Sequence, residues 1–188
     1  LLPKKTRGET VQLQMRLHQG DEKSLMGMSP RGGLATSMLA LGTKKRDRQS
    51  FEDALDGLRA KLSIGGGETD TVVRGQTVRT HLAELLRLTN EALREPAFAA
   101  TEFDKLKRER LASLEESKTD PQQIAERALE RWNNPYPKGD VRYTPTFDEE
   151  VAEIKAAKLD QAKAFYTRFI GGANAELAIV GDFDEVEP

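Results

Sequence analysis

Histidine, the side chain that most often binds catalytic zinc, occurs only twice in this 188-residue sequence, at His18 and His81. A catalytic zinc site normally takes three protein ligands from histidine, cysteine and carboxylate side chains. The sequence contains no cysteine, and no short motif places two histidines on one helix face. We expect His18 to be a partly exposed strand residue and His81 to be structural, so the histidine count limits the possible chemistry more than any other feature.

Other residues that could do chemistry are arranged unfavourably for it. The adjacent acids Glu115-Glu116 and Glu149-Glu150 point about 100° apart on a helix, so neither pair converges as a general acid and base. The glycine run at 65–67 lacks the spacing of phosphate-binding loops, and there is no G-x-S-x-G nucleophile motif. From the residues alone, we interpret the chain as a non-catalytic domain.

Composition excludes several classes of protein. Hydrophobic residues make up 37% of the chain and charged residues 32%, with a net charge of −2. Basic residues are interleaved with acids and not with aromatic residues, which argues against nucleic-acid binding. No stretch approaches 18 apolar residues, so we expect no membrane insertion. The absence of cysteine excludes disulfides and is compatible with a reducing cytoplasm or a bacterial periplasm, between which the sequence does not decide.

The predicted elements come next, because they must position any site. Apolar and polar residues alternate from Val11 to His18, which predicts a strand with Val11, Leu13, Met15 and Leu17 on its buried face. A hairpin follows later, with predicted strands over 63–67 and 71–78, and a buried strand is predicted over 175–183. Helical periodicity predicts helices over 30–41, 48–62, 81–93, 100–120, 122–132, 146–154 and 158–170.

Helix ends and faces can also be predicted. We expect Ser50 and Thr80 to cap their helices, and Asp120-Pro121 to start the helix that contains Trp132. Trp132 continues an apolar stripe of that helix, so we expect it to be at least partly buried. The long helix over 100–120 should present one face, formed by Phe103, Leu106, Arg110 (through its stem) and Leu114.

This order of elements predicts an α+β fold, with a mainly antiparallel sheet and segregated helices. We expect a single domain over residues 1–188, excised from a longer protein. Residues 1–8 would be the cut end of one more strand, and residues 184–188 a linker.

Several segments resemble one repeat of the insulinase/pitrilysin-type zinc metallopeptidases, whose zinc motif is H-x-x-E-H. The resemblance covers nearly the whole chain. It is carried by "MLALGTKKR", "ALREPAFAATEFDKLKRERLASLEE", "NPYPKGDVRYTPTFDEE" and "LDQAKAFYTRFIGGANAELAIVGDFD". It implies a repeat unit of the LuxS/metallopeptidase-like type.

By that resemblance, the catalytic positions of this chain are degenerate. Met38–Thr43 aligns with the segment that follows the H-x-x-E-H motif in this family. In that alignment the two histidine ligands fall at Gly33 and Ser37, and the catalytic glutamate falls at Thr36. The family's third ligand, a glutamate about 75 to 80 residues further on, corresponds to Glu116, with Glu115 as an alternative. Glycine offers no ligand, serine binds zinc poorly, and a threonine hydroxyl cannot replace a carboxylate base.

The resemblance therefore implies an inactive peptidase-like domain without a cofactor of its own. Its partner would be a sister catalytic repeat that holds zinc, and the pair would enclose a peptide substrate. Two alternatives stay open. The chain could be a non-peptidase scaffold or assembly subunit of the same fold, or a stand-alone enzyme that uses Glu115, Glu116 and a histidine.

Overall fold

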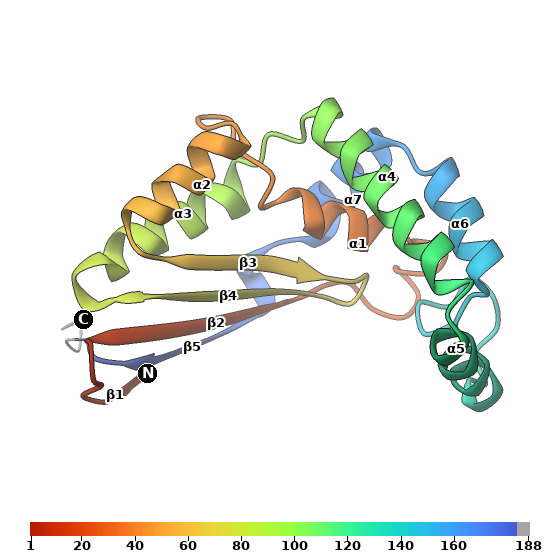
Figure 1. Cartoon of the computed structure of the whole chain (residues 1–188), viewed down its shortest axis with the longest axis horizontal. Coiled ribbons are helices and arrows are strands. Elements are labelled where there is room, and N and C mark those ends of the chain that lie inside the picture. The colour runs from red at the N-terminus through yellow and green to blue at the C-terminus, as the bar shows by residue number, and fades with distance from the viewer. Residues whose placement is uncertain (184–188) are drawn as a thin grey trace.

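A five-stranded sheet forms one layer of the molecule, seen in the computed structural model, which describes residues 1–183 (Figure 1). The strands lie in the order β1-β5-β2-β4-β3. The β1–β5 pair is parallel, and the other three pairs are antiparallel. The strands are β1 (Leu2–Pro3), β2 (Thr10–His18), β3 (Lys61–Gly66), β4 (Asp70–Val78) and β5 (Ala175–Gly181).

The two faces of the sheet differ in chemistry, as the alternation in β2 predicts. Val11, Leu13 and Leu17 are buried and Met15 is half-buried, whereas Gln12, Gln14 and Arg16 are exposed. Because successive strand residues point to opposite faces, the apolar set defines the covered face. No helix within residues 1–183 covers the opposite face, which antiparallel sheets tolerate well.

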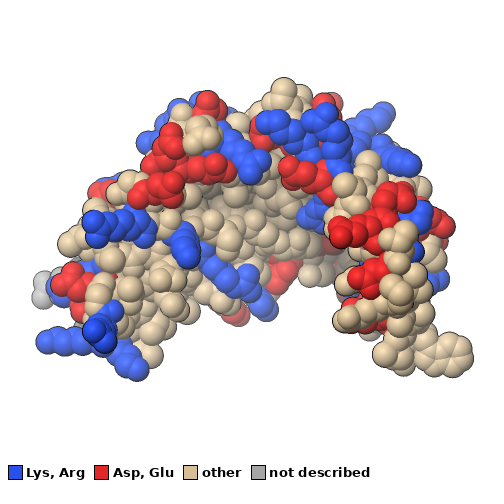
Figure 2. Space-filling model, viewed as in Figure 1, with Lys and Arg blue, Asp and Glu red and all other residues tan. Residues whose placement is uncertain are grey.

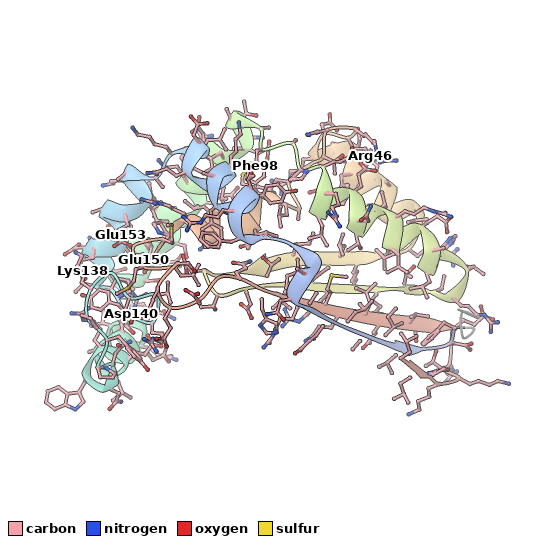
Figure 3. All side chains as sticks on the ribbon, turned by 180° about the vertical axis from the view of Figure 1, so that it is seen from behind. Arg46, Phe98, Lys138, Asp140, Glu150 and Glu153 are labelled. Carbon is pink, nitrogen blue, oxygen red and sulfur yellow. The ribbon has the colours of Figure 1, made fainter. Side chains whose placement is uncertain are left out.

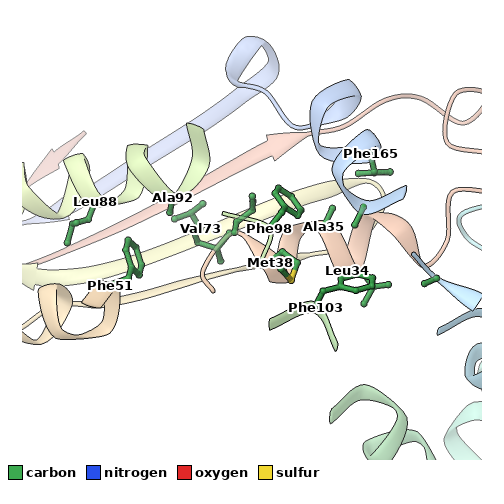
Figure 4. Close-up of a cluster of buried hydrophobic side chains, with 14 of the residues drawn as sticks. Leu34, Ala35, Met38, Phe51, Val73, Leu88, Ala92, Phe98, Phe103 and Phe165 are labelled. Carbon is green, nitrogen blue, oxygen red and sulfur yellow. The ribbon is translucent and has the colours of Figure 1, made fainter. Parts of the chain in front are cut away.

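Helices cover the apolar face and extend beyond one end of the sheet, so that the molecule forms an arch (Figure 1). Leu34, Ala35 and Met38 of α1 pack there with Phe51, Val73 and Phe165 in one core cluster (Figure 4). The described helices are α1 (Arg31–Met38), α2 (Arg48–Gly57), α3 (Leu82–Arg94), α4 (Ala100–Ser117), α5 (Pro121–Asn133), α6 (Phe147–Ala156) and α7 (Leu159–Phe169). The predicted α+β class and the predicted order of elements are confirmed.

The apolar stripe of α5 faces solvent, so the prediction that Trp132 is buried is wrong. Trp132 is 87% exposed and Leu129 62% exposed, and no residue of α5 is buried. The helix is held instead by its polar side. Periodicity shows which residues share a helix face but not which face turns inward.

Other predictions are wrong at the ends of elements. The helix predicted over 48–62 ends at Gly57, and β3 begins at Lys61, so Leu62 belongs to the sheet. Asp47, not Ser50, caps α2, with its carboxylate accepting from the Ser50 backbone N–H at 2.8 Å.

The remaining outcomes concern the helix start at residue 80, the last strand and the two ends of the chain. Thr80 lies in a 3-10 turn before α3 and makes no capping bond. Strand β5, predicted to be buried, is mostly exposed, although Ile179 and Gly181 are buried. Residues 1–8 do contribute a strand, β1, whereas the predicted linker at 184–188 lies outside the described residues.

Candidate functional site

The three positions that the family resemblance assigns to the zinc motif, Gly33, Thr36 and Ser37, all lie on α1, at one end of the sheet. Gly33 is the third residue of this helix, and Thr36 and Ser37 follow one turn later. Because residues three and four apart share a helix face, the three positions point the same way. The helix itself is fixed by apolar burial, since Leu34, Ala35 and Met38 are at most 1% exposed.

The hydroxyl groups at two of these positions are engaged with backbone. The Thr36 hydroxyl lies 3.1 Å from the carbonyl oxygen of Gly33 and 3.4 Å from that of Gly66, and Thr36 is fully buried. The Ser37 hydroxyl donates to the carbonyl oxygen of Gly33 at 2.8 Å. These hydroxyls act as local helix contacts, a common use of threonine and serine within helices.

A cation from α4 occupies the space in front of Ser37. The Nη2 group of Arg110 donates to the Ser37 hydroxyl at 2.9 Å. Arginine remains positively charged and has no lone pair available for a metal. Its charge would oppose a zinc ion at the position that the resemblance assigns to the second histidine.

The acids expected on α4 do not approach α1. Glu116 is exposed and lies about 120° around the helix from Arg110, at 100° per residue. Glu115 is also exposed and pairs with Lys118 at 3.4 Å. The face of α4 toward the core is marked by buried Phe103 and Leu114, so the structure brings Arg110 to the degenerate positions and leaves Glu116 and Glu115 away from them.

Glu68, in the β3–β4 turn, is the acid that does reach α1. Its carboxylate lies near the backbone N–H of Gly33 and the guanidinium of Arg110, and both lower its pKa. Burial raises the pKa of Glu68 above its ordinary value, because a half-buried carboxylate loses hydration, and these partners offset only part of that effect.

Gly33, Glu68 and Arg110 line a cleft of about 350 Å³, here named the α1 cleft, whereas Thr36 and Ser37 are not part of its lining. Its floor is formed by Gly33, Gly66 and Glu68, and Arg110 stands on one wall. The opposite wall comes from α5, α6 and the loop between them, and Glu150 of that wall is labelled in Figure 3.

Arg127 fixes the position of that wall. Its Nη1 group lies 3.0 Å from a carboxylate oxygen of Glu150 and donates to the carbonyl oxygen of Pro145 at 2.8 Å. Its guanidinium lies 4.5 Å from the ring centre of Phe147. The charged side of α5 therefore binds the rest of the molecule.

The α1 cleft has the shape of a site without the groups for zinc chemistry. Among residues 1–183, no three histidine, cysteine, aspartate or glutamate side chains are grouped so that they could hold a metal ion. Space is nevertheless present, because a Cβ atom added at Gly33 would meet only the Gly66 carbonyl oxygen, at 3.8 Å. The side-chain chemistry, not the room, is what is missing.

The two histidines lie away from the α1 cleft. His18 ends β2 and its Nε2 atom lies 3.5 Å from a carboxylate oxygen of Glu176. His81 lies in the 3-10 turn before α3. No helix within residues 1–183 is both long and apolar enough to cross a membrane.

Sequence reasoning missed the roles of Arg110 and Glu68. Arg110 did carry a signal, because it is a charged residue on the otherwise apolar face of α4. Glu68 carried no such signal in the sequence, because a turn residue after a glycine run gives no indication of which helix it contacts.

Comparison with known proteins supports the fold. The structure superposes on the peptidase M16 inactive domain from Pseudomonas fluorescens with a TM-score of 0.76 and 23% sequence identity, over 94% of this chain and 42% of that one. It also superposes on a conserved protein from Enterococcus faecalis V583, with a TM-score of 0.75 and 19% identity, over 98% of this chain and 46% of that one. This chain thus spans less than half of either neighbour. No protein-family model matches the sequence, and no curated protein sequence does.

Proposed function

We propose that this chain is the inactive peptidase-like domain of a zinc metallopeptidase, and that it pairs with a catalytic copy to enclose a peptide substrate. The observation that carries the proposal is the contact between Arg110 and Ser37. It puts a permanent cation where a catalytic copy would need a neutral zinc ligand. The likeness in fold to a peptidase M16 inactive domain supports the same conclusion.

The first test asks whether the chain alone has the chemistry of a peptidase. We expect elemental analysis after dialysis to find no stoichiometric zinc, and fluorogenic peptides to remain uncut. About one zinc ion per chain, or cleavage by the purified chain, would overturn the proposal.

A restored site tests the assignment of the degenerate positions. In the variant Gly33→His/Ser37→His/Arg110→Glu, two imidazoles lie at i and i+4 of α1, and a carboxylate replaces the opposing guanidinium. We expect this variant to bind zinc measurably and Gly33→His/Ser37→His with Arg110 retained to bind it more weakly. The matched control adds Glu116→Ala to the restored site and should bind zinc equally, because Glu116 is exposed and does not line the α1 cleft.

The proposed partnership has its own test. An intact H-x-x-E-H motif in the same gene or an adjacent reading frame would identify the catalytic copy. We expect that copy to co-purify with this chain and to lose most peptidase activity when this chain is omitted. Full activity of the catalytic copy alone would favour the scaffold alternative.

A further inference from the structure

The open face of the sheet carries a diagonal line of cations. Residues of β3, β4 and β2 stand opposite each other in registered rows. Lys61 is opposite Gln76, Arg74 is opposite Gln14, and Arg16 is opposite Val72. From each strand to the next, the cation is therefore shifted by two residues along the strand direction. Lys61, Arg74 and Arg16 thus form a diagonal line over three neighbouring strands. Figure 2 shows basic side chains along the sheet side of the arch.

Two of these cations are unpaired. Within residues 1–183, Lys61 and Arg74 have no carboxylate oxygen within 4 Å, whereas Arg16 lies 3.5 Å from Asp70. Both Lys61 and Arg74 are exposed. Their charges are thus available to a ligand, and Arg16 is partly neutralised at the far end of the line.

The surroundings of the cations are hollowed, and their lining mixes polar side chains with the apolar residues Leu62, Ala178 and Val180. Lys61 and Arg74 line a surface depression of about 690 Å³ on this face. The other polar lining residues are Gln12, Gln14, Ser63 and Gln76. Amides and hydroxyls can donate to and accept from a peptide backbone.

We infer that this open sheet face binds an extended peptide segment with acidic side chains at alternate positions. Diagonal neighbours in a sheet lie about 7–8 Å apart. Residues i and i+2 of an extended peptide point the same way and lie about 6.6–6.8 Å apart. Successive carboxylates on one side of the peptide therefore match the spacing from Lys61 to Arg74.

A nucleic acid fits the same face less well. Single-stranded nucleic acids are held by aromatic stacking in addition to positive charge. The strand residues on this face include no phenylalanine, tyrosine or tryptophan, and two acids, Asp70 and Glu176, stand at its end beside His18. The inference rests on the proposed role as part of a peptide enclosure, but its test needs no catalytic copy.

The test measures binding of labelled peptides to the chain by fluorescence anisotropy at low salt. We expect an alternating Glu-Ser octapeptide to bind, and Gln-Ser and Lys-Ser octapeptides to bind at least about tenfold more weakly. Added salt should weaken binding of the Glu-Ser peptide, because the charges are exposed.

Charge reversal locates the site. We expect Lys61→Glu/Arg74→Glu to raise the dissociation constant of the Glu-Ser peptide by at least about tenfold. The matched control, Arg108→Glu/Lys163→Glu, changes the net charge equally at exposed helical positions and should leave binding unchanged. Thermal melts of all variants report folding.

Three results would overturn the inference. They are equal binding of the Glu-Ser and Gln-Ser peptides, equal loss in the control variant, and tighter binding of a single-stranded oligonucleotide of the same charge than of the Glu-Ser peptide. Peptide binding by a chain that fails to pair with a catalytic copy would refute the proposed function and leave this site standing.

Discussion

Helices α1 and α5 line the same cleft, yet they are held in opposite ways. Helix α1 is fixed by apolar residues, with Leu34 and Ala35 at most 1% exposed. Helix α5 has no buried residue and is fixed by Arg127 and Arg131, whose guanidinium groups contact the loop before α6. The difference shows that a hydrophobic stripe on a helix does not by itself identify the core.

The largest expected effect contrasts two aromatic side chains. Phe165→Ala should lower the free energy of unfolding by about 3–5 kcal/mol, because this ring is buried in the core next to α1. Trp132→Ala should change it by less than about 0.5 kcal/mol, because the indole is solvated. Urea denaturation of both variants measures the contrast. Similar losses for the two would show that α5 packs through its apolar stripe after all.

Alanine substitutions at the adjacent glycines Gly32 and Gly33 should have opposite effects on stability. A Cβ atom at Gly32 would lie 2.7 Å from the Cα atom of Glu68 and 2.9 Å from the ring of Phe165, so Gly32→Ala should cost about 1–3 kcal/mol. At Gly33 there is room, and alanine favours helix, so Gly33→Ala should stabilise by up to about 1 kcal/mol. Denaturation midpoints of the two variants should move in opposite directions, and a shift of both in one direction would contradict this packing.

The attachment of α5 can be weakened without touching its stripe. Arg127→Gln should cost about 1–2 kcal/mol, because it removes charge-assisted hydrogen bonds at a half-buried position. Hydrogen exchange should become faster in α5 and stay unchanged in α1. Gln123→Ala, at an exposed position of the same helix, is the control. Faster exchange throughout the chain would show that α5 is not a separate unit.

The smallest expected effect concerns pH at the other end of the α5–α6 loop. The Thr146 backbone N–H, followed by Lys138 and Tyr143, lowers the pKa of Glu149 from 4.5 to about 2. A lowered pKa means that the ionised form stabilises the fold above about pH 4.5, and that this contribution is lost as pH falls toward 2. Glu149→Gln should therefore flatten the decline of the denaturation midpoint over that range. An unchanged decline would place the acid sensitivity in other carboxylates.

Much of the fold could be predicted from local patterns. The alternation in β2 defines the covered face, and Asp120-Pro121 marks the start of α5, because both signals act within a few residues. The direction of Trp132 could not be predicted, because it depends on contacts of Arg127 with distant residues, a hydrogen bond to the Pro145 carbonyl oxygen and an ion pair with Glu150.

The candidate site divides in the same way. The sequence shows that Gly33, Thr36 and Ser37 carry no zinc-binding side chain, and the family resemblance singles out those positions. The approach of Arg110 depends on how α4 crosses α1, and the approach of Glu68 depends on the β3–β4 turn. Contacts between segments far apart in the chain leave no periodic signal.

The contrast between Gly32 and Gly33 has a consequence for how such a site changes over generations. A side chain at position 33 would project into the α1 cleft, so adding one leaves the interior packing intact. Position 32 tolerates no added atom without displacing its neighbours. Selection for folding thus restricts one position and leaves the next free to drift. A domain built this way can gain or lose its chemistry in few mutational steps while its architecture persists.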